Sequence, residues 1–162
     1  YGIAGLASAL VAGTQIAAGV AVPWVRRLFG RRTDALLVAA VTSVALLAIL
    51  GLTPSFVLAI VVLALWSFVS ALSMPVRQAY LNGVIASDQR ATVLSFDSLM
   101  GSAGGVVAQP LLGRVADVSG YGMSVVASAA IRTLALPFVL LARRENAPSD
   151  PITDEERDDA DG

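Results

Sequence analysis

The sequence predicts an all-α polytopic membrane helix bundle with about five transmembrane helices. Hydrophobic residues fill 56% of its 162 positions and charged residues 14%, whereas soluble domains average about 45–50% and about 25%. Residues 3–25 and 35–76 contain no charged side chain. Four arginines lie between these stretches, at positions 26, 27, 31 and 32. A guanidinium at the bilayer centre is costly, so this loop is expected at a membrane surface.

Arginines also set the expected orientation. Cytoplasmic loops of membrane proteins carry an excess of Lys and Arg, which places residues 26–34 on the cytoplasmic side. Alternation then puts residues 77–90 and everything from Arg143 onward on the same side. We therefore expect a multi-pass protein of the cell (cytoplasmic) membrane, in contact with lipid and with a cytoplasmic C-terminus.

The transmembrane bundle is expected to occupy residues 1–144, with spans at about 1–25, 34–52, 55–81, 92–118 and 121–142. The first span is rich in small residues, which allow close helix packing in lipid. Asp34 is a candidate N-terminal cap for the second span, whose even apolarity favours an outer, lipid-facing position. Pro75 should bend the third span near its end.

The fourth span contains Asp97, Gln109 and several glycines, so it is expected to face protein or a water-filled cavity. Gly120 and its neighbours form the turn to the fifth span, which ends at Arg143 and Arg144. Residues 145–162 hold eight of the twelve acidic residues and two prolines. This segment is predicted to be a disordered, solvated acidic tail in the cytoplasm.

The composition excludes several kinds of chemistry. The chain has no cysteine and no histidine, which removes thiolate nucleophiles, Cys-ligated metals and the commonest proton shuttle. Gly101 and Gly104 lie in an apolar span without a following lysine, so they are not a phosphate-binding loop. We expect no enzyme activity, no metal site, no cofactor and no nucleic-acid partner.

The start of the chain is also informative. It opens with Tyr1 rather than Met, already inside an apolar run, and lacks the basic region of a signal peptide. We therefore expect this chain to be the C-terminal part of a longer protein with further helices upstream.

Three motifs resemble the major facilitator superfamily (MFS) of transporters. Residues 29–32, with Gly30, Arg31 and Arg32, are similar to the arginine-rich loop that joins helices eight and nine, although its leading Gly and Asp are missing. Residues 104–117 resemble the end of helix eleven, with Gln109-Pro110-x-x-Gly113 echoing the Gly-Pro-x-x-Gly signature of antiporters. Residues 90–95 resemble the cytoplasmic entry to helix eleven.

The resemblance covers residues 1–144 and would make them helices eight to twelve of a twelve-helix transporter. It implies an incomplete MFS-like C-terminal bundle, whose partner would be the missing N-terminal helices of the same transporter. The family fold places a substrate site between two bundles near the bilayer midplane. Helices eight, ten and eleven would line that cavity, and helices nine and twelve would face lipid.

Two charged residues inside the spans are candidates for coupling or gating. Asp97 could couple transport to protons, because intramembrane acids are costly and usually functional. The structural alternative, which we favour, is an ion pair with Arg77 or Arg90. Arg132 lies near the centre of the last span and could bind an anionic substrate, although this role is disfavoured if the span is the outer helix twelve. It could also form a structural pair or extend to the interface.

Gln15, Trp66 and Gln109 are candidates for contact with the substrate, since the resemblance places them on cavity-lining helices. Interhelical hydrogen bonding and ordinary packing are the alternatives. We expect a fragment of a secondary active transporter that moves a small solute by alternating access, most simply as proton-coupled efflux. The rival hypothesis is a non-transporting membrane scaffold or assembly subunit; a membrane enzyme is disfavoured.

Overall fold

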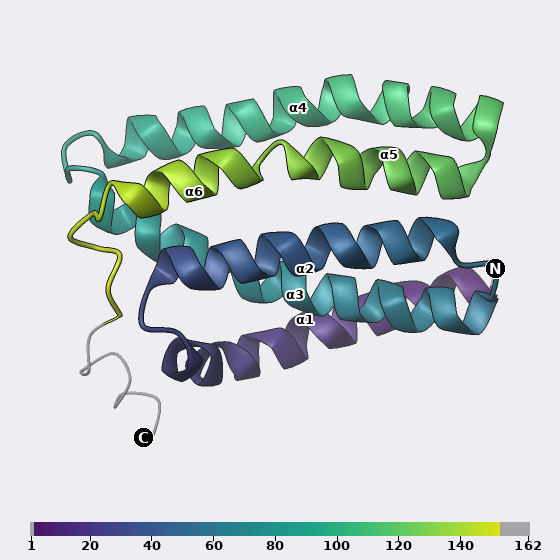
Figure 1. Cartoon of the computed structure of the whole chain (residues 1–162), viewed down its shortest axis with the longest axis horizontal. Coiled ribbons are helices and arrows are strands. Elements are labelled where there is room, and N and C mark those ends of the chain that lie inside the picture. Colours follow the sequence, from purple (N-terminus) through teal and green to yellow (C-terminus); the bar gives the residue numbers. More distant parts are fainter. Residues whose placement is uncertain (1, 153–162) are drawn as a thin grey trace.

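Helices account for nearly all of the secondary structure in the computed structural model, which describes residues 2–152. Figure 1 shows the helices lying lengthwise beside one another, with α4 along one edge and the successive helices α5 and α6 next to it. The elements are α1 (Gly2–Leu28), α2 (Arg32–Leu52), α3 (Phe56–Val84), α4 (Arg90–Ser119), α5 (Tyr121–Thr133) and α6 (Leu136–Arg144). Within the described part of the chain no strand is present, which confirms the all-α prediction.

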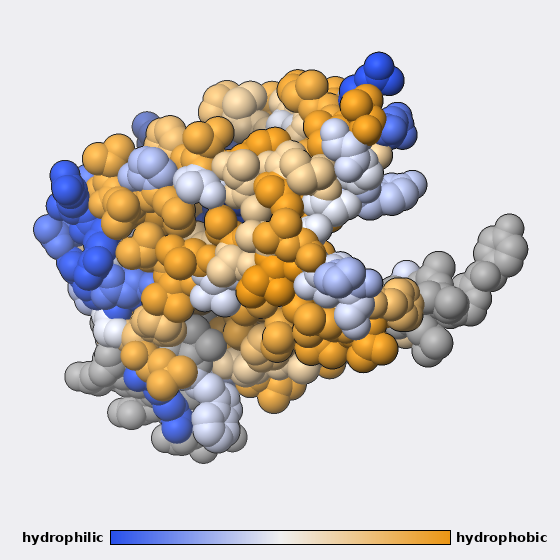
Figure 2. Space-filling view, turned by 45° about the vertical axis from the view of Figure 1, so that its right-hand side comes forward, coloured by the Kyte–Doolittle hydropathy of each residue, from blue (hydrophilic) through white to orange (hydrophobic). Residues whose placement is uncertain are grey.

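Among the residues that the structure describes, four stretches of helix are long and apolar enough to cross a membrane: α2, α3, α4, and α5 together with α6. Residues 8–24 of α1 form a shorter apolar helix. Figure 2 shows apolar side chains over most of the visible face, with the larger hydrophilic cluster at one end. An apolar exterior suits lipid rather than water, so the chain is a multi-pass membrane protein.

Helix α2 lies at the centre of the fold. It packs against α3, α5 and α6, and Thr33, Ala35, Ser43 and Leu47 on it are buried. Helix α2 is therefore not at the edge of this chain, but Val38 and Val41 on it are half-exposed, and its expected contact with lipid stays a prediction. A uniformly apolar sequence does not distinguish a helix packed against other helices from one that faces lipid, because a neighbouring helix and a lipid tail are equally apolar.

The end of the bundle opposite the arginine-rich loop is held by a close approach of two glycines. A Cβ added to Gly122 would lie 2.5 Å from the carbonyl oxygen of Gly51, and one added to Gly51 would lie 2.6 Å from that of Gly122. Only glycine allows the backbones of α2 and α5 to meet this closely. We call Gly51 and Gly122 the glycine contact.

The last span, expected as one helix over residues 121–142, is interrupted. Helix α5 ends at Thr133, and α6 begins at Leu136 with Pro137 in its first turn. Proline has no N–H to donate, and its ring clashes with the carbonyl oxygen four residues earlier. The interruption lies immediately after Arg132 and next to the cavity described below.

Candidate functional site

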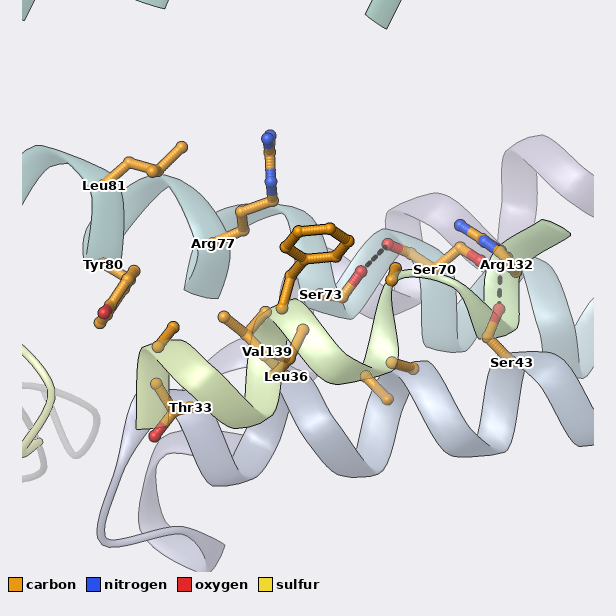
Figure 3. A pocket seen from close by; sticks show the side chains of 15 residues that line it. Thr33, Leu36, Ser43, Ser70, Ser73, Arg77, Tyr80, Leu81, Arg132 and Val139 are labelled. Atoms are coloured by element: carbon orange, nitrogen blue, oxygen red, sulfur yellow. Dashed lines mark hydrogen bonds between the residues drawn. The ribbon is translucent and has the colours of Figure 1, made fainter. Parts of the chain in front are cut away.

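A cavity of about 510 Å³ lies among α2, α3, α5 and α6 (Figure 3). Its volume falls within the range of roughly 300–1,000 Å³ typical of small-molecule sites. Its polar lining consists of Thr33, Ser43, Ser70, Ser73, Arg77, Tyr80 and Arg132, and its apolar lining includes Leu36, Leu81, Phe138 and Val139. Two arginines line this cavity, and among the described residues no acidic side chain does.

Arg132 extends from α5 toward α2 and α3. Its Nη1 atom donates a hydrogen bond to the Ser43 hydroxyl at 2.7 Å, as Figure 3 shows. Its guanidinium carbon lies 5.5 Å from the centroid of the Trp66 ring, within range of a cation–π interaction. Among the described residues no carboxylate forms an ion pair with Arg132. The positive charge of Arg132 therefore contacts the Ser43 hydroxyl and the Trp66 ring.

Two hydrogen-bond donors near Arg132 have no partner. The Trp66 indole nitrogen and the Ser70 hydroxyl oxygen are both buried, and neither makes a hydrogen bond within the described part of the chain. Both residues lie on α3, four positions apart, so they project from the same face of the helix. Buried polar groups are nearly always paired. Ser70 lines the cavity of about 510 Å³, and Trp66 lines a smaller one. Each unpaired donor therefore marks a position where a ligand or water would supply the acceptor.

Asp97 on α4 pairs with Arg77 on α3. Arg77 Nη1 donates to Asp97 Oδ2 at 3.0 Å, and Arg77 Nη2 contacts the other carboxylate oxygen. Both side chains are partly exposed. Arg77 is one of the two partners expected for the structural interpretation of Asp97. Since Arg77 also lines the cavity, the pair connects the cavity wall to α4.

The three predicted substrate-contact residues do not lie together. Trp66 lines a cavity of about 290 Å³ that it shares with Arg132. Gln15 lines another cavity, of about 380 Å³, between α1 and α3. Gln109 is exposed on α4. Ser43 and Ser70 were not among the site residues predicted from the sequence. The available signal was that each is a polar residue in an otherwise apolar span.

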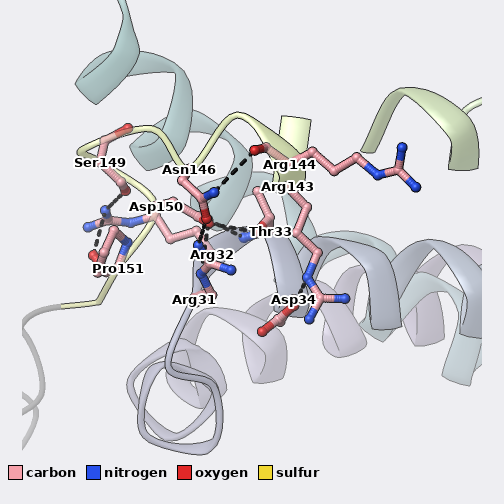
Figure 4. Close-up of polar contacts among 10 residues, drawn as sticks. All are labelled: Arg31, Arg32, Thr33, Asp34, Arg143, Arg144, Asn146, Ser149, Asp150 and Pro151. Carbon is pink, nitrogen blue, oxygen red and sulfur yellow. Dashed lines mark hydrogen bonds and ion pairs between the residues drawn. The ribbon is translucent and has the colours of Figure 1, made fainter. Parts of the chain in front are cut away.

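The arginine-rich loop meets the beginning of the acidic tail, and Asp150 lies at the centre of this contact (Figure 4). The side chain of Asp150 is fully buried. Its carboxylate accepts hydrogen bonds from the Thr33 backbone N–H at 2.8 Å and the Thr33 hydroxyl at 2.9 Å. It also pairs with Arg31 Nε at 3.2 Å. Asp150 therefore caps the N-terminus of α2, whose own N-cap residue, Arg31, provides no side-chain cap.

Backbone contacts extend this arrangement. The Arg32 N–H donates to the Asp150 carbonyl at 2.8 Å, and the Ile152 N–H donates to the Gly30 carbonyl at 3.1 Å. The Arg32 guanidinium bonds the carbonyl of Ser149, and Arg31 bonds the side chain of Asn146. A Cβ on Gly83 would overlap Ser149, so the tail also lies against the end of α3. We call residues 146–152 the tail segment.

These contacts correct two predictions. The tail segment packs on the bundle, although the acidic tail was expected to be solvated from residue 145; residues 153–162 lie outside the described part. Asp34 pairs with Arg143 at 2.9 Å instead of capping α2. Average composition cannot show which acid reaches the arginines. The available signal was the turn-forming run Pro148-Ser149-Asp150-Pro151.

Comparison with known proteins identifies the family. The family model described as Major Facilitator Superfamily matches residues 1–160, nearly the whole chain. No curated protein and no solved structure matches it. The match agrees with the helical membrane architecture and with the motifs in the arginine-rich loop and α4. The chain belongs to the major facilitator superfamily of transporters.

Proposed function

We propose that this chain is part of a secondary active transporter that moves a small solute across the cell membrane by alternating access. The observation that carries the proposal is the cavity at Arg132, a charged, partly open site inside a membrane-spanning bundle. Ionisable residues at such depth are costly and mark substrate or ion pathways. A scaffold subunit has no need of such a cavity or of an arginine without an acidic partner in it.

In this proposal the arginine-rich loop, the tail segment and the C-terminus face the cytoplasm. Arg31 and Arg32, together with Arg143 and Arg144, lie at the same end of the bundle as the tail segment (Figure 4). The glycine contact, which bears no charge, then faces the opposite side. This arrangement follows the excess of positive charge in cytoplasmic loops.

Protons are the proposed coupling ion, and efflux is the proposed direction. The support is the Asp97–Arg77 pair, which joins α3 to α4 at the edge of the cavity. Protonation of Asp97 would remove the charge that Arg77 contacts and loosen the two helices. Gln15 and Gln109 remain candidates for solute contact, since they lie on the other helices of the bundle.

Reconstitution in proteoliposomes of the purified full-length transporter, of which this chain is proposed to be part, tests this function. A pH gradient imposed across the membrane should drive release of a loaded solute, and D97N should abolish the response to the gradient while leaving exchange in the absence of a gradient. D88N, in the exposed loop before α4, serves as the matched control and should behave like the wild type. Folded protein that moves no solute of a broad panel under a proton or sodium gradient would instead favour the scaffold hypothesis.

A further inference from the structure

The chemistry around Arg132 points to one class of ligand. Within the part of the chain that the structure describes, the cavity wall carries two arginines and no carboxylate. Arg77 already has an acidic partner in Asp97, whereas Arg132 has none among the described residues. We propose that Arg132 binds the carboxylate of a small organic anion whose apolar body lies in the cavity. This inference rests on the proposed transport function and names the substrate class of its site.

Donor geometry supports a carboxylate at this position. A guanidinium has five N–H donors, and the Ser43 hydroxyl accepts from only one of the terminal nitrogens of Arg132. The Ser70 hydroxyl, which lines the same cavity, is buried and has no hydrogen-bond partner among the described residues. A carboxylate offers two oxygens that accept several hydrogen bonds. One carboxylate in the cavity could thus accept hydrogen bonds from Arg132 and from the Ser70 hydroxyl, and it would compensate the charge of Arg132.

The rest of the cavity suits an apolar body. Leu36 and Val139 line it toward the arginine-rich end (Figure 3), and Phe138 is also part of the lining. A volume of about 510 Å³ is enough for a ring-sized group with substituents. A cation is disfavoured by the two arginines in the wall. A compact inorganic oxyanion such as phosphate would leave this apolar wall without a contact partner. The apolar wall therefore favours an organic carboxylate over inorganic phosphate.

The protein provides its own optical probe for this site. It has two tryptophans, so the variant W24F leaves Trp66, whose ring lies under the Arg132 guanidinium, as the sole tryptophan. Its emission is recorded in detergent while benzoate, benzamide, benzylamine or inorganic phosphate is added. Benzoate should change the emission and saturate, whereas uncharged benzamide, cationic benzylamine and phosphate should not.

Three further variants, each combined with W24F, locate the effect. R132Q should weaken benzoate binding by roughly tenfold or more, as expected for loss of a charge-assisted pair, and R132K should retain part of the binding. S70A should weaken binding without lowering the unfolding temperature, since the Ser70 hydroxyl oxygen has no partner to lose. R114Q, on the exposed face of α4, is the matched control and should bind as well as W24F alone.

The proposal is overturned if benzoate binds no better than benzamide, if phosphate binds as well as benzoate, or if R132Q binds benzoate normally. It is also overturned if S70A lowers the unfolding temperature and leaves binding unchanged, because Ser70 would then be structural. Binding is measured without a gradient, which separates the two proposals. Selective benzoate binding without flux would refute the transport function alone, and gradient-driven flux with no effect of R132Q on binding would refute the anion site alone.

Discussion

The two ends of this bundle are held together by different kinds of interaction. At the arginine-rich end, Asp150 is buried against Thr33 and Arg31, and Asp34 pairs with Arg143. At the opposite end, Gly51 and Gly122 bring two helices into backbone contact without any charge. One end therefore depends on charge and hydrogen bonding, and the other on the absence of side chains. Substitutions and salt should affect the two ends differently.

The largest effect is expected at Asp150. D150A removes a fully buried carboxylate, leaves its donors on Thr33 unpaired and exposes the start of α2. Loss of a cap together with one partner of a largely buried pair should cost roughly 2–4 kcal/mol in the free energy of unfolding. Unfolding in detergent, followed by circular dichroism, measures the change.

Asp88 provides the matched control for this prediction. It is an exposed acid in the loop before α4, and D88A should change the stability little. Should D150A prove as stable as D88A, the tail segment does not hold the arginine-rich end together. The variant D150N, which keeps the shape and the acceptor oxygen, should lie between the two.

A smaller effect is expected at the glycine contact. In G122A the new Cβ would lie 2.5 Å from the Gly51 carbonyl oxygen, so one helix must move. Overpacking of this kind costs about 1–3 kcal/mol. G113A is the matched control, because a Cβ there meets open space and alanine favours a helix over glycine by up to about 1 kcal/mol. Equal unfolding temperatures for G122A and G113A would show that the helices do not meet as described.

The smallest effect is expected from Asp34 and Arg143. Both side chains are partly exposed, and exposed pairs contribute about 0.2–1 kcal/mol. A double-mutant cycle with D34N and R143Q should give a coupling energy in this range that declines as NaCl is raised, because salt screens exposed charges. The loss of stability in G122A should not change with salt. Coupling that stays constant in high salt would contradict an exposed electrostatic contact.

The sequence allowed good prediction of what depends on local composition. The expected spans at 34–52 and 55–81 correspond to α2 (Arg32–Leu52) and α3 (Phe56–Val84), because charges and turn residues end apolar helices. Asp97 pairs with Arg77, one of its two expected partners. This pair was predictable because few charged residues lie near the ends of the neighbouring spans. The family resemblance, drawn from three short motifs, is confirmed by the family match over residues 1–160.

Features that depend on contacts between distant residues were not predicted. Asp150 lies more than a hundred positions from Thr33 in the sequence, and nothing local separates it from the other acids of the tail. The central position of α2 was missed because lipid and helix neighbours select the same apolar residues. The cavity brings Ser43, Ser70 and Arg132 together from three helices. Their convergence is a property of packing that no single helix carries.

Water access to the cavity tests the central claim, a solute site around Arg132, most directly. The chain has no cysteine, so a single engineered thiol can be followed cleanly. A135C lies in the cavity wall at the α5–α6 interruption, and V41C is a half-exposed control on the apolar surface of α2. In membrane vesicles, A135C should react quickly with a charged, membrane-impermeant thiol reagent, and benzoate should slow it, while V41C stays unreactive. Equally slow reaction at both positions would mean that no water-accessible site exists there, and the account would be wrong.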